Sequence, residues 1–282
     1  MLKPYKHFFS EIIQRALTED LGIGDITSEL TIPNSTTSSG KFISKSSGII
    51  CGWPVVKEVF RQLNPGIFLD IYLPDGSTVA PGDLLAVISG PVKDLLAGER
   101  VALNFLQHLS GIATYTKKLV NQISDYPNTR IVDTRKTIPG LRILQKYAVR
   151  TGGGYNHRYN LADAVLIKDN HLAACGGIKP AIEMVRKGIP HTMTIEVEVE
   201  SEEQVREALE AKADIIMLDN MSPELMRKMV SLINGQACVE ASGNITIENI
   251  REVAATGVDI ISVGHLTHSV EALDISLKLE NL

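Results

Sequence analysis

Six apolar runs rich in β-branched residues recur through the second half of the chain. They cover residues 130–134, 163–169, 194–200, 214–220, 237–243 and 259–265. Each run is followed by polar residues and then by a stretch with helical spacing of apolar residues, so one repeat has the length of a strand plus a helix. Repeated βα units build a parallel sheet, and six or seven of them are too many for a small two-layer sheet and close to the eight of a complete β/α barrel. The pattern therefore predicts an α/β fold with a β/α barrel.

Two of the intervening helices have clear start signals. The stretch SEEQVREALEAK begins with Ser201, and SPELMRKMVSLIN begins with Ser222 and Pro223. A serine hydroxyl accepts a hydrogen bond from a backbone N–H of the first helical turn, and proline is favoured at the first helical position because it needs no such bond. Helices are therefore predicted to start at these residues, directly after the third and fourth runs.

The first hundred residues have a different pattern. Residues 73–91 contain short apolar runs separated by Asp-Gly, Pro-Gly-Asp and Gly-Pro, which are typical of hairpin turns in an antiparallel sheet. One helix is predicted over the apolar spacing before residue 22, and a long helix over residues 95–123 leads toward the barrel. The domain boundary is placed near residue 110.

Composition narrows the class of protein. The chain has 282 residues and a formal net charge of -5, so affinity for anions must come from local clusters rather than from the whole surface. The N-terminal segment interleaves apolar and charged residues, unlike a signal peptide, and no window approaches a membrane span. Three cysteines lie far apart with no C-x-x-C pair, which favours a reducing compartment, so a cytoplasmic protein is expected.

Basic residues gather where strands are predicted to end. Arg135 and Lys136 follow the first run, and His157, Arg158 and Lys168 lie before and within the second. The carboxyl ends of barrel strands share one mouth, which would concentrate positive charge in a protein of negative net charge. Arginine's planar fork suits carboxylates and phosphates, and lysine adds a compact positive charge. A solvated loop explains one basic pair alone, but the whole set predicts a strongly anionic substrate.

Acidic residues end the next strands. Glu196, Glu198 and Glu200 alternate with valines, so all three carboxylates are expected on one face of a strand. Carboxylates in a dry barrel interior need counter-charges, which the basic residues can supply. Glu198 and Asp219 could alternatively hold Mg2+, which takes carboxylate oxygens and usually arrives with phosphate ligands. For Glu196 and Glu200 the interpretation is stabilising ion pairs or solvent-facing charges.

Small and hydroxyl-bearing residues end the last two runs, in EASGN (240–244) and VGHLTHS (263–269). Barrels often bind phosphate in the loops after their last strands and at a helix N-terminus. Helix capping by Ser242 or Thr246 is the competing interpretation, and His265 and His268 could be packed loop histidines. Both interpretations stay open from these residues alone.

Eight short motifs, in this order, resemble one known family. They are GER (98–100), DTRKT (133–137), GGGYNHR (152–158), IKDNH (167–171), EVEVE (196–200), LDN (218–220), EASGN (240–244) and VGHLTHS (263–269). Together with EDLGIGDIT (19–27), the set resembles quinolinate phosphoribosyltransferase over nearly the whole chain. The resemblance implies an N-terminal α/β sandwich domain over residues 1–110, with a C-terminal helix over 270–282 as a candidate addition. It also implies a catalytic, incomplete β/α barrel of about six or seven strands over residues 111–269.

The resemblance also implies roles for single residues. Lys136, Glu198 and Asp219 are expected to be catalytic, the latter two near the metal, and Arg100 is expected to come from the neighbouring subunit. The group expected around the quinolinate carboxylates is Arg135, His157, Arg158 and Lys168. The whole expected substrate-binding set is Arg100, Thr134, Arg135, Lys136, His157, Arg158, Lys168, Ser242, Gly243, Asn244, Gly264, His265 and His268. Asn244 stands where a small residue is common in the family, which narrows the expected phosphate loop.

Enzymes of that family transfer phosphoribose from phosphoribosyl pyrophosphate to the nitrogen of quinolinate. Pyrophosphate and carbon dioxide leave, and nicotinate mononucleotide is made for NAD biosynthesis. The resemblance thus implies a pentosyltransferase that uses Mg2+ and two small-molecule substrates, without a nucleic-acid or membrane partner. It also implies a homodimer or a higher multiple, with an active site shared between subunits.

Three alternatives remain on the sequence alone. A related protein associated with molybdenum transport looks similar along its length, although the dense carboxylate-binding set favours quinolinate. A lysine Schiff-base aldolase would use Lys136 or Lys168 at a strand end. A non-catalytic anion-binding protein is the third, and it would gain nothing from Glu198 and Asp219 near its ligand.

Overall fold

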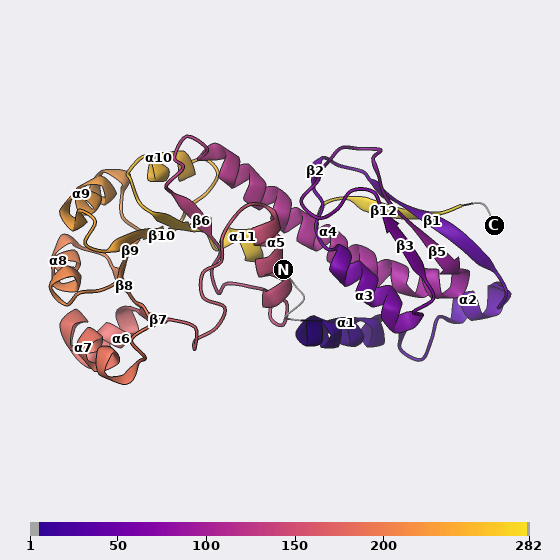
Figure 1. Ribbon diagram of the computed structural model, residues 1–282, viewed down its shortest axis with the longest axis horizontal. Coiled ribbons are helices and arrows are strands. Elements are labelled where there is room, and N and C mark those ends of the chain that lie inside the picture. Colours follow the sequence, from indigo (N-terminus) through magenta and orange to yellow (C-terminus); the bar gives the residue numbers. More distant parts are fainter. Residues whose placement is uncertain (1–5, 281–282) are drawn as a thin grey trace. The chain divides into compact units, whose positions relative to one another are not determined.

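The chain forms two compact units. The computed structural model describes residues 6–280, with the side chains of residues 9–280 (Figure 1). The first unit comprises Met1–Lys117, Thr137–Gly153 and Thr267–Leu282, and the second comprises Lys118–Lys136 and Gly154–Leu266. The two units therefore change over near residue 117, and the first unit also takes up two later segments of the chain.

The second unit is built on a six-stranded parallel sheet. Its strands are β6 (Arg130–Val132), β7 (Val165–Ile167), β8 (Ile195–Val199), β9 (Ile215–Asp219), β10 (Cys238–Ser242) and β11 (Ile260–Ser262). Their order in the sheet is β6-β11-β10-β9-β8-β7, with parallel pairing throughout. Each strand lies inside one predicted run, and β6 and β7 are the outer strands of the described sheet. The incomplete barrel is therefore confirmed.

Helices lie along the outer side of this sheet (Figure 1). They are α6 (Asp169–Cys175), α7 (Ile178–Gly188), α8 (Glu202–Glu210), α9 (Pro223–Ile233) and α10 (Ile250–Ala254). Both predicted caps form, because the hydroxyl of Ser201 accepts from the Gln204 N–H and that of Ser222 accepts from the Leu225 N–H. Since the helices bury the apolar residues of each strand, the polar residues are left at the carboxyl ends and on the inner face.

The first unit combines an antiparallel sheet with helices. Strands β12 (Ile275–Leu279), β1 (Thr37–Ser44), β5 (Leu84–Pro91) and β3 (Phe68–Ile71) form the sheet in that order, and β2 (Gly48–Ile49) pairs with β4 (Thr78–Val79). The helices of this unit are α1 (Lys6–Leu21), α2 (Ile26–Thr31), α3 (Trp53–Leu63), most of α4 (Val92–Gln122) and α5 (Arg142–Thr151). The predicted N-terminal helix, long helix and antiparallel sheet are all present.

The helix expected over residues 270–282 is wrong, because the structure has strand β12 within this range. β12 pairs antiparallel with β1, where Phe42 lies opposite Leu277. Ile275 and Leu277 are buried on one face, in the period-two spacing of a strand. Gly40 makes room for the leucines, since a Cβ at that position would lie 2.9 Å from Leu279 Cδ2. The free edge of β1 therefore decides the conformation of this segment.

Two further observations concern the described residues as a whole. Among residues 6–280, no helix combines the length and hydropathy that crossing a membrane requires. Cys51, Cys175 and Cys238 are free thiols, as their spacing in the sequence indicates.

Candidate active site

A buried aspartate joins the end of β6 to the glycine-rich segment. Asp133 directly follows β6 and is fully buried. Its carboxylate accepts a hydrogen bond from Asn156 Nδ2 at 2.6 Å and another from the His157 backbone N–H at 3.0 Å. Because these bonds fix residues 154–158 against the strand end, they also fix the segment beside Arg135, which is exposed two residues after Asp133.

The charges of two guanidinium groups, those of Arg135 and Arg158, influence each other in this region. Nη1 of Arg158 donates to the Ala164 carbonyl at 2.8 Å. Burial lowers the pKa of Arg158 and the positive charge of Arg135 lowers it further, while the carboxylates of Glu196 and Asp163 raise it. Like charges repel each other unless an anion lies between them. The pair Arg135 and Arg158 is therefore suited to receive an anionic group.

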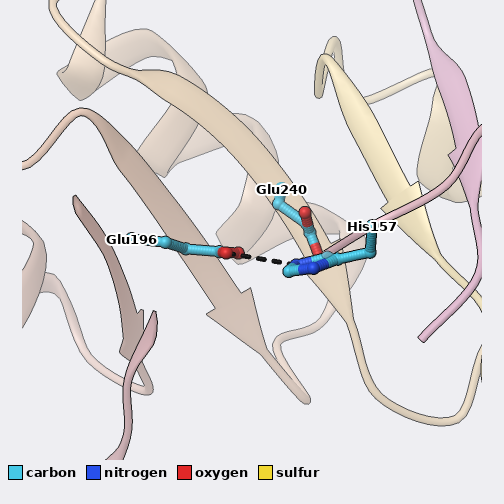
Figure 2. A group of neighbouring side chains, drawn as sticks. All are labelled: His157, Glu196 and Glu240. Atoms are coloured by element: carbon cyan, nitrogen blue, oxygen red, sulfur yellow. Dashed lines mark ion pairs between the residues drawn. The ribbon is translucent and has the colours of Figure 1, made fainter. Parts of the chain in front are cut away.

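His157 lies beside two glutamates of the parallel sheet, Glu196 and Glu240 (Figure 2). Its Nε2 is 3.1 Å from Oε2 of Glu196 on β8 and 3.8 Å from Oε1 of Glu240 on β10. Both glutamates are buried, and burial followed by the charge of Glu196 raises the pKa of Glu240 to about 7. Glu196 thus has His157 as a polar partner within 3.1 Å, whereas Glu200 is exposed to solvent.

Lysine and carboxylate groups meet at the ends of β7, β8 and β9. Lys168 follows β7, and its Nζ forms an ion pair with Glu198 of β8. Asp219 is the last residue of β9, where burial raises its pKa and the charge of Glu198 raises it further. The neighbouring Lys168 acts in the opposite direction and lowers that pKa. The predicted counter-charge for Glu198 is thus Lys168, and Asp219 is close enough to interact with both.

Asn220 connects Asp219 to the loop after β10. Its Nδ2 donates to Asp219 Oδ2 at 2.8 Å, and its Oδ1 accepts from Asn244 Nδ2 at 3.1 Å. Its backbone N–H donates to the Ser242 carbonyl at 3.0 Å. Gly243 has a φ of +96°, and a Cβ there would lie 2.2 Å from Asn220 Oδ1. The acidic end of β9 and the expected phosphate loop therefore form one hydrogen-bonded group.

The capping interpretation of this loop is wrong. Helix α10 has Asn249 at its N-cap position, whereas Ser242 is the last residue of β10 and Thr246 lies three residues before the cap. Gly264 and His265 follow β11, where the short helix α11 (His265–His268) begins. Small residues and backbone amides thus remain at the carboxyl ends of β10 and β11.

Some expected site residues are not part of the second unit. Arg100 is exposed on α4, and His268 is exposed with its Nδ1 2.6 Å from Ser269 Oγ; both belong to the first unit. Thr134 is in the second unit, where its Oγ1 accepts from the Lys136 N–H at 3.0 Å. Substrate contacts by Arg100, His268 and Thr134 stay predictions.

Family models match nearly the whole described chain. A model described as "Quinolinate phosphoribosyl transferase, N-terminal domain" matches residues 25–110, and one described as "Quinolinate phosphoribosyl transferase, C-terminal domain" matches residues 112–278. The chain belongs to the quinolinate phosphoribosyltransferase family. The resemblance that the eight motifs indicated is therefore confirmed.

Similar proteins within the quinolinate phosphoribosyltransferase family come from bacteria and plants. The chain is 46% identical over 267 residues to a "Probable nicotinate-nucleotide pyrophosphorylase [carboxylating]" of Bacillus subtilis, covering 95% of this chain and 92% of that protein. It is 41% identical over 289 residues to a mitochondrial "Quinolinate phosphoribosyltransferase [decarboxylating] 2" of Nicotiana glauca, covering 96% of this chain and 82% of that one. The crystal structure of NadC from Streptococcus pyogenes superposes with a TM-score of 0.95 at 41% identity, covering 100% of this chain and 99% of the other.

Two buried acids of this quinolinate phosphoribosyltransferase family member lie in the sequence motifs, but the motifs predict no role for them. Asp133 is part of DTRKT, and in the structure it orders the loop that carries His157. Glu240 is part of EASGN, and in the structure its Oε1 lies 3.8 Å from His157 Nε2. The sequence offered one signal for Glu240. It lies on the same face of its strand as Ser242, while the neighbouring Val239 and Ala241 lie on the other face.

Proposed function

We infer that this chain transfers phosphoribose from phosphoribosyl pyrophosphate to quinolinate, with decarboxylation to nicotinate mononucleotide, as a pentosyltransferase of NAD biosynthesis. One observation carries the inference. The carboxyl ends of the parallel strands bring the Arg135 and Arg158 pair and the Lys168 and Glu198 pair into one unit. This arrangement suits two polyanionic substrates, and the relatives described above carry the name of this reaction.

Quinolinate has two carboxylates, which need charge-assisted donors. Arg135 and Arg158 supply two guanidinium forks, and Lys168 supplies an ammonium group that Glu198 holds at the next strand end. His157 lies beside Arg158 but both of its ring nitrogens face protein groups. We therefore place Arg135, Arg158 and Lys168 in contact with the substrate and His157 next to them.

We place the donor phosphates at the carboxyl ends of β10 and β11, which lie between β6 and β9 in the sheet. The positive φ of Gly243 and the small residues after β10 and β11 let backbone N–H groups approach a phosphate closely. Glu198 and Asp219 fit a magnesium ion that is bound mainly through substrate phosphates, because burial and then the charge of Glu198 raise the pKa of Asp219, and a cation offsets both effects. When bound, Mg2+ would neutralise the charge that develops on the leaving pyrophosphate.

The chemistry follows from the charges. As the bond to pyrophosphate breaks, positive charge builds on the ribose, where the carboxylates of Glu198 and Asp219 stabilise it. Lys136, exposed beside Arg135, balances the negative charge of the phosphates. Attack by the ring nitrogen leaves a cationic pyridinium, which stabilises the electron pair left on the adjacent ring carbon when its carboxylate departs as carbon dioxide. A proton from water then takes the place of the lost carboxylate. No further cofactor is needed for that step.

The alternatives have less support. A Schiff-base aldolase needs a free amine, whereas Lys168 is ion-paired with Glu198. Borohydride trapping with carbonyl substrates tests the remaining candidate, Lys136. The molybdenum-associated function gains no support from the site or from the relatives described above.

Direct assay tests the proposed function. The purified protein is incubated with quinolinate, phosphoribosyl pyrophosphate and Mg2+ while nicotinate mononucleotide and carbon dioxide are followed, with nicotinate as the control acceptor. We expect product from quinolinate and little or none from nicotinate, because only quinolinate has the second carboxylate. Equal turnover of nicotinate, or no product from either acceptor, contradicts the proposal.

Arg135 provides the first site-specific prediction. Arg135→Ala removes charge-assisted hydrogen bonds worth about 1.5 to 3 kcal/mol each, so kcat/KM for quinolinate should fall by at least about tenfold. The matched control is Arg227→Ala, which removes an exposed arginine from α9 of the same unit. Steady-state kinetics on both folded variants give the comparison. Wild-type kinetics in Arg135→Ala would remove this residue from the site.

We also propose that the protein acts as a homodimer in the cytoplasm. Three free thiols suit a reducing compartment. Arg100, exposed on α4, is then available to complete the site of a neighbouring subunit. Sedimentation analysis gives the oligomeric state, and a monomer with full activity would contradict the shared site.

A further inference from the structure

Three side chains from separate segments of the second unit meet in the interior of its sheet (Figure 2). His157 comes from the loop before β7, Glu196 from β8 and Glu240 from β10. Their side chains are 14%, 4% and 2% exposed, and one nitrogen or oxygen atom of each lies within 4.8 Å of the others. None of the roles proposed above for substrate contact or catalysis uses the two glutamates.

Hydrogen bonds fix the protonation of the His157 ring. Nδ1 accepts from the Arg158 backbone N–H at 2.8 Å, so Nδ1 carries no proton. The proton of a neutral imidazole is then on Nε2, which points to Glu196 Oε2 at 3.1 Å. The carboxylate of Glu196 thus favours the tautomer with the proton on Nε2, in which Nδ1 accepts the hydrogen bond from the Arg158 backbone N–H.

The same bonds argue against a metal ion in this cluster. A histidine nitrogen binds a metal ion through its lone pair, and Nε2 of His157, which faces the two glutamates, carries the proton. The other nitrogen faces the Arg158 backbone instead. The cluster is therefore suited to holding a ring in place rather than to coordinating a cation.

Glu240 completes the surroundings of Glu196. In the described part of the chain, Glu196 Oε1 and Glu240 Oε1 are buried oxygens without a hydrogen-bond partner. Two ionised carboxylates side by side in a dry interior are unfavourable, and a proton on one of them supplies the missing donor to the other. The raised pKa of Glu240 is consistent with its being that donor.

The consequence of this arrangement reaches Arg158. Its backbone N–H is held by His157, its side-chain Nη1 by the Ala164 carbonyl, and the preceding N–H by Asp133. Glu196 also attracts the Arg158 guanidinium, which opposes the repulsion from Arg135. A loop held in this way keeps the Arg158 guanidinium in place before any substrate is bound.

We propose that Glu196, supported by Glu240, is a positioning residue for quinolinate: it holds His157 in the Nε2-protonated tautomer, and His157 in turn holds Arg158 at the carboxylate-binding position. The inference rests on the proposed function, since it assigns Arg158 to quinolinate. Neither glutamate touches the substrate, and both act through His157.

Kinetics provide the first test. Glu196→Ala is expected to raise the KM for quinolinate by about tenfold or more, the effect of losing a charge-assisted hydrogen bond, and to leave the KM for phosphoribosyl pyrophosphate within about twofold. Glu196→Gln keeps an oxygen that accepts from Nε2, so it should restore most of the affinity. Glu240→Gln mimics the protonated acid and should be close to wild type. The control is Glu183→Ala on α7, an exposed residue of the same unit.

Ring ¹⁵N chemical shifts of histidine-labelled protein provide a second test that needs no substrate. The His157 signals, identified by their absence from His157→Asn, should show a protonated Nε2 and an unprotonated Nδ1 in the free wild-type protein. Glu196→Ala should lose this pattern and Glu196→Gln should keep it. This measurement separates the inference from the proposed function, because it holds or fails whether or not nicotinate mononucleotide is formed.

Three outcomes would overturn the inference. The first is a wild-type His157 with its proton on Nδ1. The second is a folded Glu196→Ala protein that keeps the wild-type tautomer. The third is a rise in both KM values by the same factor, which would indicate a general loss of structure in place of a specific effect on quinolinate.

Discussion

Single backbone positions with a positive φ hold the two ends of the site together. Asn220 has a φ of +52° and Asn244 a φ of +49°, a conformation that asparagine adopts more easily than most residues. Gly243 lies next to Asn244, and its missing side chain leaves the space that Asn220 Oδ1 occupies. The ends of the neighbouring strands β9 and β10 thus depend on contacts between small or amide-bearing residues.

Gly243→Ala tests the importance of this contact. A methyl group there meets Asn220 Oδ1 and requires L-residue strain of about 1 to 3 kcal/mol, so the loop has to move. We expect the KM for phosphoribosyl pyrophosphate to rise by about tenfold and the KM for quinolinate to change less. Steady-state kinetics with each substrate varied in turn give both values.

Gly257 serves as a control that has the backbone strain of a positive φ without a close side-chain contact. Gly257 also has a positive φ, +90°, but a Cβ there would make only an ordinary contact at 3.5 Å with Val230. Gly257→Ala should therefore lose stability and keep both KM values. If Gly243→Ala also keeps both, the loop after β10 does not bind the phosphates.

Which site residues the sequence could reveal depended on distance along the chain. Arg135, Lys168 and Asp219 follow apolar runs directly, so the end of each strand marks them. Glu240 could not be assigned in this way, because its partner His157 is far away in sequence and reaches it only once the sheet is curved. Contacts between side chains of distant segments, such as that of His157 with Glu240, depend on the folded sheet, and no local sequence pattern predicts them.

At the level of elements, one buried carboxylate links two helices of the first unit. Glu58 of α3 is 4% exposed and is bonded by Arg61 of the same helix, with Nη2 to Oε1 at 2.6 Å. Ser10 Oγ of α1 donates to the same oxygen at 2.7 Å, and Gln62 Nε2 at 3.1 Å. The bonds from Arg61 are the main cause that lowers the pKa of Glu58 to about 2 from 4.5.

This depressed pKa predicts a pH-dependent stability. The folded protein favours the ionised form, so Glu58 contributes about 3 kcal/mol above pH 4.5, and the contribution is lost as the pH falls from 4.5 toward 2. Glu58→Gln should therefore be less stable than wild type at pH 7, and the difference should shrink below pH 4.5. Urea unfolding at steps from pH 7 to pH 3 measures this.

The exposed residue Glu11 of α1 is the matched control. Glu11→Gln removes a carboxylate from the same helix pair without removing buried hydrogen bonds, so its effect should be small at every pH. A constant difference between Glu58→Gln and wild type across the whole range would show that ionisation of Glu58 does not matter.

Element type was predictable where burial is local. The six runs became strands because most of their apolar residues are buried in the sheet, and two of the helices between them, α8 and α9, start at serine caps that the sequence displays. The segment containing β12 was assigned incorrectly because five residues carry too short a pattern to separate a helix from a strand. What decides its conformation is the edge of β1, more than two hundred residues earlier in the chain.

At the level of the whole molecule, the proposed homodimer predicts complementation between two defective chains. Arg100→Ala and Lys136→Ala each remove one cation expected at the site, so each protein alone should be nearly inactive. Random mixing of the two should restore about one quarter of the wild-type activity, because half of the dimers are mixed and each of these has one intact site. Activity is measured after subunit exchange has been verified by mass spectrometry.

The opposite assignment makes a different prediction. If Arg100 serves the site of its own chain, a mixed dimer contains no intact site and activity does not return after exchange. A chain carrying both substitutions, mixed with wild type, controls for stabilisation by the partner alone.

The position of β12 has a consequence for how a newly made chain folds. β1 ends at Ser44 and leaves the ribosome early, but the strand that covers its outer edge begins only at Ile275. Domains made first usually finish folding first, whereas here the first sheet waits with an unpaired edge while the entire parallel sheet is translated. The nascent protein therefore has to be kept from pairing with its neighbours on the polysome until that late strand arrives.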